Sequence, residues 1–168
     1  MNSYTLNTVI SFFSFLLLQV FVFNHINFLG TINPMLYLLF LINYRFDQNQ
    51  TFFIMLGFAL GFSIDLLSQT GGAHTIAALT ISFFRPFIIK HSFGVISKIP
   101  KSFQSSPKTL NRFLFLFLII SIHHLIYFVV VYFSWDALYL ILKNTFLSSI
   151  FSLILILLIN SLYRNSDD

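Results

Sequence analysis

Long runs of apolar residues dominate the chain, and short polar segments separate them. A helix needs roughly 20 apolar residues to cross the hydrocarbon core of a bilayer. Because runs of this kind recur, the pattern predicts an all-α integral membrane protein with six transmembrane helices, in a single domain over residues 1–168. The expected spans are 5–23, 26–44, 51–67, 72–89, 113–133 and 137–162.

The second of these runs is the least regular, because Gly30 and Pro34 interrupt it. The uninterrupted part, residues 35–43, is too short to cross a bilayer as a helix. It therefore predicts either a broken span or a re-entrant segment, and we favour the broken span.

Composition agrees with a membrane protein and argues against an enzyme. Hydrophobic residues make up 57% of the chain and charged residues 8%, whereas a soluble domain carries about 25% charged residues. The chain has no cysteine, so it forms no disulfide, thiolate nucleophile or cysteine metal site. Outside the C-terminal tail the only acids are Asp47, Asp65 and Asp136, which lie far apart in sequence. We therefore expect no catalytic site, no cofactor and no metal.

The basic residues predict an orientation, because cytoplasmic loops are enriched in Lys and Arg. Six spans with cytoplasmic N- and C-termini place residues 45–50, 90–112 and the C-terminal tail inside, where eight of the nine Lys and Arg residues gather once Arg85 is counted with them. The outer segments, which hold no Lys or Arg, are 24–31, 68–72 and 134–136. Only Lys143 does not fit this orientation, and its long side chain can snorkel from the sixth helix to the outer surface.

The cytoplasmic loop 90–112 carries Lys98, Lys101 and Lys108 among serines and prolines. Such a loop attracts anionic lipid headgroups, and a docking loop for a cytoplasmic partner is the alternative. Just before the loop, we expect Arg85 to snorkel to the inner interface and Pro86 to terminate the fourth helix. An ordered contact of Arg85 at the inner face is the other interpretation.

Asp65 is the main candidate for a functional site, because a carboxylate within an apolar span costs a few kcal/mol. Gly57, Gly61 and Asp65 are spaced four apart, so they share one helix face. Glycines let a neighbouring backbone come close, so this face packs the third helix against the fourth or lines a central cavity. Gly72 and His74 follow the turn after Asp65. We favour a helix–helix clamp between Asp65 and His74 over a proton-linked or ligand-binding pair.

His123 and His124 lie midway along the fifth span. Adjacent residues on a helix point about 100° apart, so the two rings do not form one site. We expect each to make hydrogen bonds between helices, and a proton relay is the alternative. Tyr127 lies one turn further on, where it can share the face of either His123 or His124.

The pattern Gly-Phe-x-x-Gly-x-x-x-Asp-Leu-x-Ser over residues 57–68, followed by a glycine turn, resembles the signature of the MreD family, the rod shape-determining membrane proteins. Residues that support the resemblance are Pro34, Gly72, Ala73, His74, Arg85 and Pro86. The resemblance is motif-specific over residues 34–86 and is only hydropathic elsewhere. One departure is that Gln69 and Thr70 stand where many relatives have Gly.

The resemblance implies a non-enzymatic scaffold in the bacterial inner membrane. Proteins of this family accompany MreC in the elongation machinery, which links MreB filaments to peptidoglycan synthesis by RodA and a penicillin-binding transpeptidase. Their fold is similar to that of the six-helix substrate-capture subunits of energy-coupling-factor transporters. The main alternative is therefore a small-molecule capture subunit of a vitamin-type transporter, with Asp65, His74 and His123 around a cavity. An intramembrane enzyme is a further alternative, but no nucleophile–base pair can be assembled from these residues.

Overall fold

The computed structural model describes residues 3–26, 32–94, 100–103 and 108–164, and this part of the chain is helical and contains no strand. The elements are α1 (Ser3–Phe21), η1 (Phe23–His25), α2 (Leu38–Asn43), α3 (Gln50–Ser68), α4 (Ala73–Phe93), α5 (Thr109–Tyr132), η2 (Trp135–Ala137) and α6 (Leu138–Arg164). Four stretches are long and apolar enough to cross a membrane, namely Tyr4–His25, Gln50–Ser68, Thr109–Tyr132 and Trp135–Ser161. The fold is that of an all-helical membrane protein.

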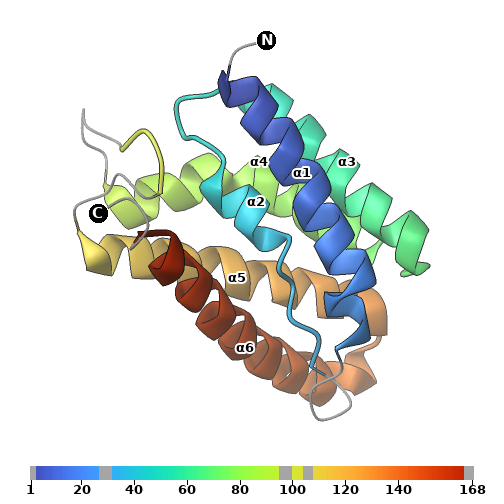
Figure 1. Ribbon diagram of the computed structural model, residues 1–168. Coiled ribbons are helices and arrows are strands. Elements are labelled where there is room, and N and C mark those ends of the chain that lie inside the picture. The colour runs from blue at the N-terminus through green and yellow to red at the C-terminus, as the bar shows by residue number, and fades with distance from the viewer. Residues whose placement is uncertain (1–2, 27–31, 95–99, 104–107, 165–168) are drawn as a thin grey trace.

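The long helices form a row in which neighbours in sequence are neighbours in space (Figure 1). α4 packs against α3 and α5, α6 packs against α5, and α1 packs against α3. The short α2 lies between α1 and α6 in Figure 1. The starts of α1, α3 and α5 lie at one end of the bundle, and η1, the α3–α4 turn and the α5–α6 turn lie at the other.

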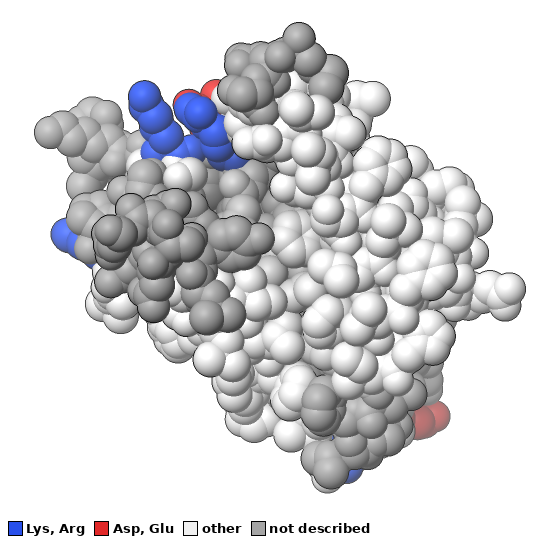
Figure 2. Space-filling model, viewed as in Figure 1, with Lys and Arg blue, Asp and Glu red and all other residues white. Residues whose placement is uncertain are grey.

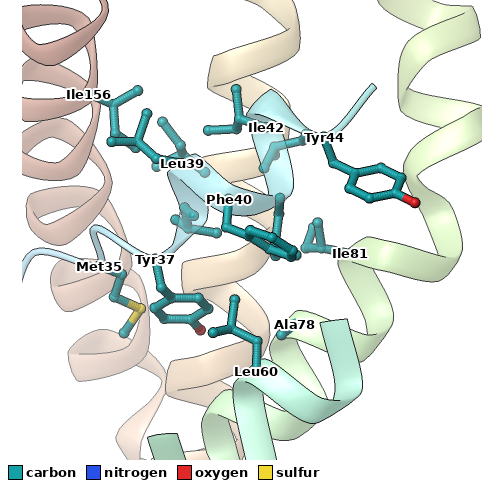
Figure 3. Close-up of a cluster of buried hydrophobic side chains, with 14 of the residues drawn as sticks. Met35, Tyr37, Leu39, Phe40, Ile42, Tyr44, Leu60, Ala78, Ile81 and Ile156 are labelled. Carbon is teal, nitrogen blue, oxygen red and sulfur yellow. The ribbon is translucent and has the colours of Figure 1, made fainter. Parts of the chain in front are cut away.

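The segment around α2 is not a continuous helix. α2 has six residues, and the described residues 32–37 before it are not helical. Residues 37–42 are nevertheless at most 3% exposed, so α2 is apolar and buried on every side. Figure 3 shows side chains of this segment among Ile156 of α6, Leu60 of α3 and Ile81 of α4.

Side chains from neighbouring helices satisfy the non-helical backbone before α2. Gln19 of α1 accepts a hydrogen bond from the Tyr37 N–H at 3.2 Å and donates one to the Pro34 carbonyl at 3.3 Å. Ser152 of α6 accepts one from the Met35 N–H at 3.2 Å. An unpaired backbone group in an apolar interior costs several kcal/mol, so these side chains allow an irregular segment at the centre of the bundle.

The end of α4 and the start of α5 differ from the sequence expectation. α4 continues to Phe93 instead of ending at residue 89, α5 begins at Thr109 instead of 113, and the 90–112 loop is correspondingly shorter. The expectation that Pro86 terminates the helix is wrong, because Pro86 lies inside α4. The Ser82 carbonyl, which the proline leaves without its helical donor, accepts a hydrogen bond from Gln50 Nε2 at 2.7 Å. Gly94, with φ of 88°, ends the helix instead.

The face of α3 that carries Gly57 and Gly61 packs directly against α4. A Cβ atom on Gly57 would lie 2.0 Å from Ser82 Oγ, and one on Gly61 would lie 2.6 Å from the His74 carbonyl oxygen. Both glycines therefore permit a helix contact that any larger residue would push apart.

We expect Gly61→Ala to lower the free energy of unfolding by about 1–3 kcal/mol, because the added methyl group meets the α4 backbone. Gly57→Ala meets the Ser82 side chain instead, so the double variant Gly57→Ala/Ser82→Gly should recover part of the loss. Thermal unfolding in mild detergent measures all three variants. Equal stability of Gly61→Ala and the unmodified chain would contradict the close packing.

Candidate functional site

The Asp65 carboxylate, near the end of α3, is 7% exposed and is surrounded by donors from the start of α4. Its Oδ1 accepts hydrogen bonds from Thr70 Oγ1 at 2.5 Å and the His74 N–H at 3.1 Å, and lies 3.0 Å from His74 Nδ1. Its Oδ2 accepts hydrogen bonds from the Thr75 N–H at 2.7 Å and from Thr75 Oγ1 at 2.5 Å. Because a carboxylate only accepts hydrogen bonds, His74 Nδ1 carries the proton in this arrangement.

Asp65 acts as a cap for α4 from the neighbouring helix. His74 and Thr75 lie in the first turn of α4, and the N-cap residue Gly72 has no side chain that could bind their N–H groups. The first N–H groups of a helix lack partners within the helix and form the positive end of its dipole. The Asp65 carboxylate satisfies two of them, which an Asp or Ser at the N-cap normally does, and in doing so joins α3 to α4.

Three residues of the turn between α3 and α4 have positive φ, namely Gln69 (55°), Gly71 (66°) and Gly72 (93°). Glycine adopts this left-handed conformation readily, whereas other residues pay about 1 kcal/mol or more. The backbone at Gln69 is therefore of the kind that favours glycine.

His74 extends the polar cluster toward the centre of the bundle. Its ring centroid lies 4.7 Å from that of Tyr127 and 5.7 Å from that of Tyr37. The Tyr37 hydroxyl lies 2.5 Å from His123 Nε2. His123 Nδ1 is buried and finds no hydrogen-bond partner among the described residues, so the line of polar groups ends inside the bundle. The structure thus brings Asp65, His74 and His123 into one region without forming a path between the two ends.

His124 points to a different element from His123. Its Nδ1 lies 2.8 Å from the Ile120 carbonyl and its Nε2 lies 3.2 Å from Ser152 Oγ of α6. The same Ser152 hydroxyl accepts the hydrogen bond from the Met35 N–H. Both histidines therefore make contacts between elements, and His124 supports the irregular segment before α2.

Arg85 does not snorkel, so that expectation is wrong, and the side chain makes an ordered contact within the bundle instead. The side chain is 2% exposed, and its Nη2 donates to the carbonyls of Tyr44 and of Ile42, the latter at 3.4 Å. Its guanidinium carbon lies 4.3 Å from the Phe53 ring centroid and 4.9 Å from that of Phe46. Because these carbonyls lie at the C-terminal end of α2, where a cation is favourable, Arg85 caps α2 from α4.

Most of the basic residues gather at one end of the bundle. Figure 2 shows Lys and Arg side chains gathered near the end of the bundle where α1 begins. Lys101 and Lys108 are exposed. Lys98 lies outside the described residues. Arg45 and Asp47 form an exposed ion pair, with Nη2 and Oδ2 2.5 Å apart, and hydrogen bonds from Arg45 hold the pKa of Asp47 below its usual value.

A small polar cavity of 130 Å³ lies beside His74 at the opposite end. Its lining residues are Gln19, Asn24, Asn33, Met35, Ser68, Thr70, His74 and Tyr127. Ligand sites usually measure about 300–1,000 Å³, so this cavity suits a few water molecules. Among the described residues, no three His, Asp or Glu side chains come close enough to hold a metal ion.

Several residues that make polar contacts around Asp65, His74, His123 and His124 were not proposed as site residues from the sequence, namely Gln19, Tyr37, Thr70, Thr75 and Ser152. The sequence did contain a signal for Gln19, because it is an amide deep within an apolar span and such a group needs a partner. Ser152 had none, since α6 carries other serines at similar spacing.

Comparison of the chain with protein-family models, with curated proteins and with solved structures finds no match in any of the three. The geometry itself defines the class, a helical membrane protein in which buried charged side chains cap the ends of neighbouring helices.

We expect Asp65→Asn to lower the free energy of unfolding by about 2–4 kcal/mol, because an amide offers one acceptor oxygen and turns its own N–H groups toward the α4 donors. Thr70→Val is the matched control. It removes one hydrogen bond to the same carboxylate but leaves the helix cap in place, and should cost about 1 kcal/mol. Unfolding in mild detergent gives both values, and an Asp65→Asn loss no larger than the control would contradict the capping role.

Proposed function

We propose that the chain is a non-enzymatic scaffold of the bacterial inner membrane, of the MreD type. It binds an MreC-like protein and helps couple MreB filaments to peptidoglycan synthesis by RodA and a penicillin-binding transpeptidase, and so to rod shape. Anionic lipids contact its basic cytoplasmic face, and it binds no nucleic acid.

The observation that supports this proposal most is the use made of Asp65. Its carboxylate accepts hydrogen bonds from His74 and Thr75 at the start of α4 and from Thr70 in the turn before it, so the acid of the motif has a structural role in holding α3 against α4. Gly57, Gly61 and His74 meet at the same helix contact. The left-handed backbone at Gln69 also suits the glycine that the MreD pattern carries in this turn.

The proposal includes six membrane crossings with both termini cytoplasmic. In Figure 1 the segment before α2 and α2 itself run from the η1 end of the bundle to the end where α3 starts. α4 carries Arg85 and Lys90 and is less apolar than the four candidate spans, but it runs between α3 and α5. If the α2 segment and α4 each cross the membrane, the basic residues of the loops between helices lie on one side, as expected from the enrichment of Lys and Arg in cytoplasmic loops.

The alternative, a transporter capture subunit, is less well supported. Its proposed ligand contacts include Asp65 and His74, yet the carboxylate already accepts from Thr70, His74 and Thr75. The cavity beside His74 measures 130 Å³, below the 300–1,000 Å³ typical of ligand sites. Larger hollows of 650, 430 and 410 Å³ lie elsewhere, and neither Asp65 nor His74 lines them.

A pull-down of the tagged full chain in mild detergent, with the eluate analysed for proteins and metabolites, tests the function. We expect recovery of an MreC-like bitopic protein and cell-wall synthases. Asp65→Leu should reduce this recovery and disturb cell shape, because it removes the clamp between α3 and α4. Asp136→Asn alters an exposed aspartate at the opposite end from the basic face and should change neither.

Two results would contradict the proposal. One is co-purification of an ATP-driven transporter module or of one stoichiometric metabolite. The other is an Asp65→Leu variant with unchanged levels, partner recovery and cell shape.

A further inference from the structure

The turn between α5 and α6 presents aromatic side chains to the outside of the protein. Phe133 is 89% exposed, Trp135 is 91% exposed and Tyr139, one turn into α6, is 73% exposed. We call these three residues the aromatic tip. It lies at the end of the bundle that holds η1 and the α3–α4 turn, away from most of the basic residues.

Phe133 occupies a backbone position that does not suit it. It ends α5 in the left-handed conformation, with φ of 39°, which glycine adopts most easily. A ring that is 89% exposed gains little packing within the chain to offset this strain. The exposed ring is therefore available to contact whatever surrounds the protein at this end.

The length of α5 indicates what surrounds the tip. Arg112, near the basic end of α5, precedes Tyr132 by 20 residues, which is about 30 Å of helix. This equals the thickness of the hydrocarbon core, roughly 30 Å. With Arg112 at the headgroups of one leaflet, Phe133 and Trp135 lie at the headgroups of the other.

The surface next to the tip is continuous with the lipid-facing surface of the two spans. Exposed apolar side chains lead up to it on both helices, namely Val129, Val131, Leu138 and Leu142. The nearest charged residues on the two helices are Asp136 at the turn and Lys143 two turns below it, and both are exposed. The lysine stem is long enough to carry its charge toward the headgroups.

We propose that the aromatic tip is an interfacial anchor, which holds the α5–α6 hairpin in the headgroup layer of the leaflet opposite the basic face. Trp and Tyr rings are favoured at this depth because one part of each ring is apolar and another is polar. The inference concerns a surface separate from the Asp65 cluster and does not depend on the proposed scaffold role.

The chain itself supplies the reporter, because Trp135 is its only tryptophan. The full chain is placed in phosphatidylglycerol–phosphatidylcholine nanodiscs whose lipids carry bromine either near the acyl carbonyl or near the terminal methyl group. We expect the shallow bromine to quench Trp135 fluorescence several-fold more than the deep bromine. Aqueous iodide should quench it several-fold less than it quenches free tryptophan amide.

The double variant Trp135→Phe/Phe146→Trp is the control, since Phe146 is an exposed residue of the α6 span that lies 11 residues beyond Trp135, about 16 Å of helix and so near the middle of the hydrocarbon core. Its fluorescence should be quenched more by the deep bromine, which reverses the order. Quenching of Trp135 by iodide as strong as for the free amide, without quenching by bromine, would mean that the tip stands in water and is open to a protein partner. That result, or the same depth for both reporters, would overturn the anchor.

Discussion

Buried backbone groups that lack helical partners are the constraint on which this structure depends. The segment before α2 runs through the centre of an apolar bundle without forming a helix, and the hydrocarbon of a bilayer offers no partners for its N–H and C=O groups. Gln19 from α1 and Ser152 from α6 supply the partners. Each of these polar side chains lies in a span otherwise suited to lipid, so their positions within the spans are explained by the backbone they support.

The buried charged side chains of Asp65 and Arg85 likewise pair backbone groups that lack partners, in this case at helix ends. Asp65 binds the N–H groups that open α4, and Arg85 binds the carbonyls that close α2. Each charge therefore meets the helix end of opposite sign, an interaction worth up to about 2 kcal/mol in partly buried sites. Asp65 joins α3 to α4 and Arg85 joins α4 to α2, so the two charged side chains connect three elements through hydrogen bonds.

The sequence predicted those parts of the structure that depend on local pattern. Apolar runs located α1, α3, α5 and α6, and the four-residue spacing of Gly57 and Gly61 identified the face that packs on α4. Gly30 and Pro34 showed that the second run is broken. Contacts between distant residues could not be anticipated in the same way. Pro86 remains inside α4 because Gln50, 36 positions earlier, binds the free carbonyl, and Arg85 stays buried because α2 ends beside it.

The proposed six-span topology requires that the broken segment around α2 carries the chain from one side of the membrane to the other. The chain has no cysteine, so single cysteines can replace His25, Gln48, Lys108 or Asp136 and be labelled with a membrane-impermeant maleimide in oriented vesicles. The account predicts that positions 48 and 108 are labelled from one side and positions 25 and 136 from the other. Labelling of positions 25 and 48 from the same side would show that the segment is re-entrant and would contradict the account.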